Sequence, residues 1–213
     1  MKKTLWMVCL ISLLSNFSFA QNEKIKNGFT AYFDENYNPI TEEAFENRKW
    51  KNNLLAIQGD LINQKILISR ERQGFIENKI NFDYLLSAAI NLKIDSSKTI
   101  VIIYHPGKDH CNSSGKATNR SRKIWFDELE RKVYKITQTK PIYIYKDKEG
   151  TEQDDGIIAW YKDANQTIEK LFFNRHYPCS SFVVISKEGR FFSYFGEFSK
   201  EMVWNTAKIL TNK

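Results

Sequence analysis

The residues best suited to chemistry in this 213-residue chain are thiols and imidazoles gathered in two short segments. Apart from Cys9 near the amino terminus, the cysteines and histidines are His105, His110 and Cys111, followed by His176 and Cys179. Two cysteines can form a structural disulfide or exchange electrons through a reversible one. Thiolate and imidazole together are the ligands that zinc and Cu(I) prefer. The residue types therefore leave structural, redox and metal-binding roles open.

A metal site in this chain would draw its ligands from both segments. His110 and Cys111 are adjacent in sequence, and His176 stands three positions before Cys179. In the alternative interpretation, His110 lies in a loop and His176 precedes a proline turn, with no metal between them. We favour this second interpretation and predict no bound cofactor.

The first twenty residues have the pattern of a cleaved export signal. Lys2 and Lys3 precede the mostly apolar stretch 5–14, and Ser18-Phe19-Ala20 supplies the small-x-small pattern of a cleavage site. The apolar stretch is too short to span a bilayer of about 30 Å as a stable helix. We therefore predict cleavage after Ala20, a periplasmic or secreted mature protein, and no membrane span in the mature chain.

Composition and charge exclude some classes of protein and of partner. With 42% apolar and 27% charged residues, the chain is too apolar for a disordered protein and resembles an ordinary globular one. The formal net charge of +7 reflects abundant lysine, and an exported protein rarely meets nucleic acid. We predict a protein or small-molecule partner, which the sequence does not identify, and no nucleic-acid partner.

The second half of the chain predicts an α/β domain. Residues 99–105 form a continuous apolar, β-branched run, which is typical of a strand buried on both faces. The elements expected after it are a helix at 123–137, a strand at 142–146, a helix at 166–174, strands at 182–186 and 191–195, and a helix capped by Ser199. This order predicts a parallel βαβ unit, an antiparallel hairpin and helices on both faces of one mixed sheet. The expected fold is a three-layer α/β/α sandwich.

The first half of the mature chain carries weaker signals. The expected elements are a strand at 29–34, a helix at 41–48, a hairpin of 54–57 with 65–69, and a helix at 82–91. We therefore divide the chain into a signal peptide at 1–20, an N-terminal α+β extension at 21–97, and a main domain at 98–213.

The order of elements over about 99–211 resembles the thioredoxin fold. The segment 182–189 and the following Tyr194-Phe195-Gly196 look like the end of exported thioredoxin-like proteins of the TlpA/peroxiredoxin kind. In that family the redox cysteine lies just beyond the first core strand, where Cys111 falls. A cis-proline that faces this cysteine precedes the third core strand, and Pro178 lies near that position.

The resemblance implies that Cys111 and Cys179 lie at the same edge of the sheet, where they can form a disulfide. The family's Cys-x-x-Cys motif is absent, because Ser114 stands at the position of the second cysteine. We therefore favour a non-catalytic exported protein with a Cys111–Cys179 disulfide and a role in envelope binding or structure. One alternative is an envelope thiol–disulfide oxidoreductase with both cysteines as catalytic residues. The other is a copper- or zinc-binding thioredoxin-like protein with His110, Cys111, His176 and Cys179 as ligands.

Overall fold

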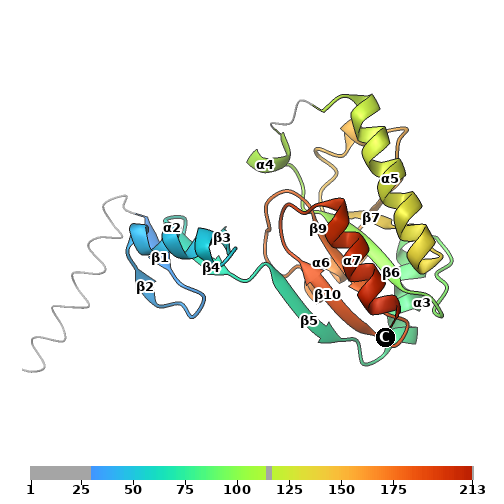
Figure 1. Cartoon of the computed structure of the whole chain (residues 1–213), viewed down its shortest axis with the longest axis horizontal. Coiled ribbons are helices and arrows are strands. Elements are labelled where there is room, and N and C mark those ends of the chain that lie inside the picture. Colours follow the sequence, from blue (N-terminus) through green and yellow to red (C-terminus); the bar gives the residue numbers. More distant parts are fainter. Residues whose placement is uncertain (1–29, 114–116, 213) are drawn as a thin grey trace, which may run out of the picture. The chain divides into compact units, whose positions relative to one another are not determined.

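The computed structural model describes residues 30–113 and 117–212, so the expected signal peptide lies outside the described residues. The chain divides into two compact units, residues 1–69 and 70–213 (Figure 1). No helix in the described part combines the length and the apolar character that crossing a membrane requires.

The first unit is a small α+β structure with one mixed sheet. Its elements are β1 (Ala31–Phe33), β2 (Pro39–Ile40), α2 (Glu42–Lys51), β3 (Leu55–Gln58) and β4 (Gln64–Ile68). The strand order is β2-β1-β4-β3, with β1 parallel to β4 and the other pairs antiparallel. Thr41 caps α2 by accepting a hydrogen bond from the Ala44 amide, and Phe45 of this helix is fully buried beside Leu67. The hairpin and the helix predicted in this region are confirmed.

The second unit contains a six-stranded mixed sheet in the order β5-β10-β9-β6-β7-β8. The strands are β5 (Glu71–Phe75), β6 (Ile100–His105), β7 (Ile142–Tyr145), β8 (Trp160–Lys162), β9 (Ser181–Ile185) and β10 (Arg190–Tyr194). β6 is parallel to β7, whereas β9 is antiparallel to both β6 and β10. The predicted parallel pair, antiparallel hairpin and mixed sheet are therefore confirmed.

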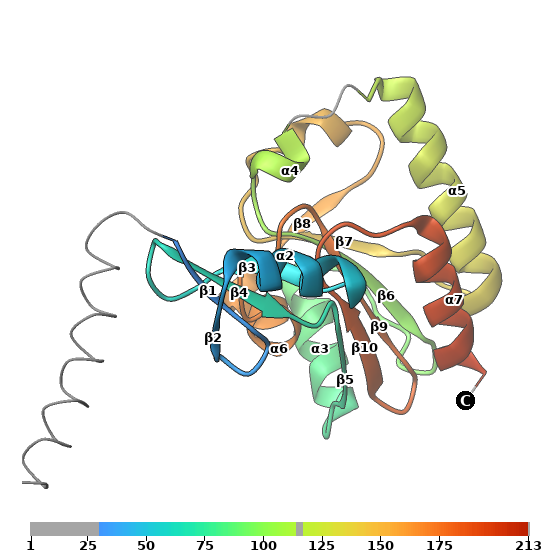
Figure 2. The same cartoon turned by 60° about the vertical axis from the view of Figure 1, so that its left-hand side comes forward.

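Helices cover both faces of this sheet. Leu129 of α5 (Asn119–Thr137) and Val203 of α7 (Lys200–Thr211) belong to one buried cluster with Ile103 of β6. On the other face lie α3 (Lys79–Ile90) and α6 (Thr167–Phe172), away from α5 and α7 (Figure 2). Tyr104 faces this second layer and stacks on Phe173 with ring centroids 4.7 Å apart. The second unit is thus a mixed α/β sandwich, as the sequence predicts.

Two strands extend the sheet beyond what the sequence indicates. β5 pairs along its whole length with β10, and β8 adds a parallel edge strand beside β7. Because β5 and α3 precede residue 98, they fall within the expected N-terminal extension 21–97. In the structure both belong to the second compact unit, which begins at Arg70.

Candidate functional site

Cys111 and Cys179 form a disulfide between residues 68 positions apart in the chain. Cys111 lies in α4 (His110–Ser113), a short helical turn after β6, and Cys179 lies just before β9. The end of β6 and the start of β9 share one edge of the sheet because Tyr104 pairs with Ser181 in the antiparallel ladder. The Cα atoms of the two cysteines are 5.1 Å apart, within the range that a disulfide requires.

A carboxylate joins the same two loops independently of the disulfide. Asp109 Oδ2 accepts a hydrogen bond of 2.9 Å from the Cys179 amide, and His176 Nε2 lies 3.4 Å from the same oxygen. Asp109 Oδ1 accepts a hydrogen bond of 2.8 Å from the Asn112 amide, and the Asn112 side chain donates to the Gly107 carbonyl. Asp109 therefore holds the loop after β6 against the loop before β9.

The loop before β9 also packs on the loop after β10. Tyr177 is buried and stacks on Phe195 with ring centroids 4.2 Å apart and an interplanar angle of 11°. Beyond Phe195, the Gly196 amide donates a hydrogen bond of 3.1 Å to the hydroxyl of Ser181, the first residue of β9. Three loops thus meet at one edge of the sheet, and we call this region the disulfide rim.

The peptide bond before Pro178 is trans, since the described residues contain no cis peptide bond. Pro178, the cis-proline candidate that the resemblance implies, is therefore not one. The chain makes the turn at Cys179 instead, whose φ of +66° lies in the left-handed region. The bond from the Cys179 amide to Asp109 anchors this turn.

Glu197 is a functional candidate that the sequence interpretation missed. Its carboxylate and the sulfurs of Cys111 and Cys179 all lie within 4.8 Å of one another. Glu197 follows Gly196 in the loop between β10 and α7, so its nearness to the cysteines depends on the antiparallel course of β10. The sequence signal that could have found Glu197 is its position directly after Tyr194-Phe195-Gly196. This segment ends the strand expected at 191–195, which runs back toward the edge of the sheet that holds the cysteines.

The predicted metal ligands are not brought into one group. Among the described residues, the group of three potential ligands consists of Cys111, Cys179 and Glu197, without His110 or His176. His176 faces Asp109 instead, and the side chain of His110 is exposed. His105, at the end of β6, is buried with Nε2 3.0 Å from the Glu149 carbonyl, which gives it a structural contact.

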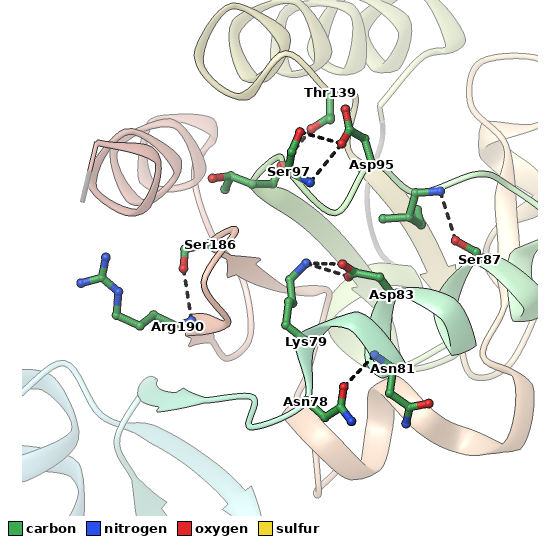
Figure 3. Close-up of polar contacts among 12 residues, drawn as sticks. Asn78, Lys79, Asn81, Asp83, Ser87, Asp95, Ser97, Thr139, Ser186 and Arg190 are labelled. Carbon is green, nitrogen blue, oxygen red and sulfur yellow. Dashed lines mark hydrogen bonds and ion pairs between the residues drawn. The ribbon is translucent and has the colours of Figure 1, made fainter.

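A buried ion pair lies near the turn between β9 and β10, at the other end of these strands. Lys79 Nζ contacts the two carboxylate oxygens of Asp83 at 2.7 and 2.6 Å, with side chains only 8% and 3% exposed (Figure 3). Both residues belong to α3, whose start contacts this turn: a Cβ on Gly189 would lie 2.7 Å from the Ile76 carbonyl oxygen. Because each charge has its partner, we assign the pair to the packing of α3.

A cavity of about 570 Å³ lies by the amino ends of β6, β7 and β8. Its size falls within the range of small-molecule sites. Ile142, Ile158 and Tyr161 supply apolar lining, and Glu130 and Lys140 pair with each other at 2.9 Å. Because these two charges compensate each other, the lining does not select a ligand of either sign.

The fold and the rim together define a disulfide-bearing protein with a mixed α/β sandwich. Comparisons with protein-family models, with curated proteins and with solved structures give no match to this chain. The role of the rim therefore has to follow from its own geometry and chemistry.

Proposed function

We propose that this chain is an exported, thioredoxin-like protein without catalytic activity, in which the Cys111–Cys179 disulfide fixes a binding rim. The strand arrangement β7-β6-β9-β10, with its parallel pair beside an antiparallel hairpin, supports the thioredoxin-like assignment. The pattern of residues 1–20 supports export, and a disulfide suits the oxidising compartment that export would reach.

The observation that carries the non-catalytic role is the acidic surrounding of the sulfurs. An attacking cysteine needs positive charge or a helix amino terminus to stabilise its thiolate. Cys111 instead lies in a four-residue helical turn with the Glu197 carboxylate close to its sulfur. A carboxylate at this distance disfavours a thiolate. The disulfide is therefore better suited to remain closed than to turn over.

Two basic residues of the following helix are paired with carboxylates elsewhere. Arg122 Nη1 lies 3.5 Å from Asp154, and Lys123 Nζ lies 2.7 Å from Asp127. Both cations thus have carboxylate partners of their own.

A cross-link between these positions would stabilise the folded protein by constraining the unfolded chain. Closing a loop of this length removes chain entropy worth about 4 kcal/mol in the loop-entropy treatment. The two cysteines lie outside the strands, Cys111 in α4 and Cys179 in the loop that carries Tyr177. The bond therefore stabilises the folded state as a whole and also links two segments that the sheet ladder does not hold together.

A thiol–disulfide oxidoreductase is the second candidate function, and the exposure of Cys111 favours it. An attacking thiolate from another protein can reach an exposed sulfur, and exposed disulfides are generally the more easily reduced ones. Cys179 would then act as the second thiol of the pair.

The reduction potential separates the two candidates. For a structural bond we expect a potential below about −300 mV and no insulin-reducing activity above background. The potential can be measured by equilibration in dithiol redox buffers, followed by alkylation and mass spectrometry. Insulin reduction that disappears in Cys111→Ser would overturn the non-catalytic assignment and establish the second candidate.

A further inference from the structure

We propose that reduction of the disulfide converts the rim into a zinc site, with Cys111, Cys179 and Glu197 as ligands. This inference concerns the reduced chain and goes beyond the structural role of the closed bond. It differs from the set expected from sequence because a carboxylate takes the place of both histidines.

The distances suit a tetrahedral ion. Zinc binds thiolate sulfur at about 2.3 Å and carboxylate oxygen at about 2.0–2.2 Å. Two sulfurs at this distance from one tetrahedral ion are about 3.8 Å apart, so each needs to move by roughly 1 Å from its place in an ordinary disulfide. All three donors already lie within 4.8 Å of one another, and the Cα–Cα distance of 5.1 Å leaves room for this side-chain rotation.

Reduction makes the rim a better site for a cation because it supplies two potential thiolate ligands. A dithiol reductant supplies two electrons and two protons, which break the sulfur–sulfur bond and yield two thiols, while the reductant itself becomes a disulfide. Zinc binding releases both thiol protons, so that two thiolates and one carboxylate surround the ion. The two thiolates and the carboxylate then carry three negative charges, which the doubly charged ion reduces to a net charge of −1. In the oxidised form the two sulfurs are bonded to each other, so the carboxylate of Glu197 is the one anionic donor among the three proposed ligands.

The backbone of the rim is held by contacts that do not involve the sulfur atoms and so do not depend on the disulfide bond. Asp109 bonds to the amides of Asn112 and Cys179, which fixes the two cysteine loops relative to each other. Tyr177, which precedes Cys179, stacks on Phe195, which precedes Glu197. These contacts keep the three ligands close when the covalent bond is absent. No fourth protein ligand belongs to the group within the described residues, so the remaining position is open to water.

The experiment uses the full chain carrying Cys9→Ser, so that Cys111 and Cys179 are the two remaining thiols. After reduction with a phosphine, titration with Zn²⁺ should give one equivalent bound, and Co²⁺ should give thiolate-to-metal charge-transfer absorbance. The unreduced protein should give neither signal. Glu197→Gln should weaken zinc binding by about tenfold or more, because loss of a direct ligand costs at least as much affinity as loss of a residue that only orients a ligand.

The matched control is Glu188→Gln in the turn between β9 and β10, which should bind zinc like the parent protein. Circular dichroism of the reduced, metal-free protein should show the same folded spectrum as the oxidised protein. A reduced protein that is unfolded, that binds no zinc, or whose affinity is unchanged by Glu197→Gln would overturn the proposal. None of these results would affect the proposed structural role of the disulfide, which is tested separately by the reduction potential and the insulin assay.

Discussion

At the scale of single residues, the ion pair of Lys79 and Asp83 shows how strongly burial changes what breaking an ion pair costs in free energy of unfolding. Asp83→Asn would leave the Lys79 ammonium in an environment where it is 8% exposed and has lost its charged partner. Breaking a buried pair in this way costs about 3–5 kcal/mol. We therefore expect urea denaturation of the variant to show a free energy of unfolding lower by about that amount.

The exposed pair of Lys123 and Asp127 is the matched control. It has the same spacing along a helix and a similar distance of 2.7 Å, but its side chains are about 60% exposed. Asp127→Asn should change the free energy of unfolding by less than about 0.5 kcal/mol. Equal losses in the two variants would contradict the role assigned to burial.

These two pairs also mark a limit of sequence-based prediction at the residue scale. In both pairs an aspartate follows a lysine by four positions, and the sequence alone does not show which of the two pairs is buried. The pairing of Cys111 with Cys179 could be predicted because few cysteines are present and the fold places them together. Glu197 could not, since one glutamate among many gains significance only from the loop packing that brings it to the sulfurs.

At the scale of elements, prediction succeeded where the hydrophobic pattern is strong. β6 and β9 are buried at every position, and their continuous apolar sequences predicted that they are buried strands. β5 has the polar sequence Glu-Arg-Gln-Gly-Phe and is largely exposed, so its pairing with β10 rests on backbone hydrogen bonds that leave little trace in composition. Edge strands of this kind escape a pattern-based interpretation because they have no buried face to reveal them.

The turn between β1 and β2 gives the first unit a specific sensitivity to acid. The Asp34 carboxylate accepts hydrogen bonds of 2.9 Å from the amides of Asn36 and Asn38 and from Arg48. These bonds, that from the Asn38 amide first, lower the pKa of Asp34 from its ordinary value of 3.8. A depressed pKa in the folded state contributes stability above pH 3.8, and this contribution is lost as the pH falls through the folded value.

We therefore expect the amide protection factors of β1, β2 and α2, which compare each exchange rate with its intrinsic rate at the same pH, to fall on acidification below this pH in the parent protein. Asp34→Asn should raise exchange at neutral pH and remove this component of the acid dependence. Asp60→Asn, in the loop between β3 and β4, is the control and should retain it. An acid response that is the same in Asp34→Asn as in the parent protein would show that another group is responsible.

At the scale of the whole molecule, the division of the chain was the hardest feature to derive from sequence. The expected boundary lay between residues 97 and 98, whereas the compact units meet between Ser69 and Arg70. β5 joins the second unit by pairing with a strand more than 100 positions later, and Phe82 of α3 packs on Phe172 of α6 with ring centroids 5.8 Å apart. Contacts between such distant segments have no signature in the local pattern, and no glycine- or proline-rich linker marks the division after Ser69.

The fragment 70–213 should therefore fold without the first unit, whereas 98–213 should not. The shorter fragment lacks the edge strand that covers β10 and the three large apolar side chains of α3 that are buried, Phe82, Leu86 and Ile90. Burial of each such side chain contributes about 1.5–3 kcal/mol, and the sum is comparable with the whole stability of an ordinary domain. Urea denaturation followed by circular dichroism should show one cooperative transition for 70–213, and size-exclusion chromatography should show 98–213 as expanded or aggregated. Equal stability of the two fragments would place the boundary back at residue 97 and make β5 and α3 dispensable additions to the sandwich.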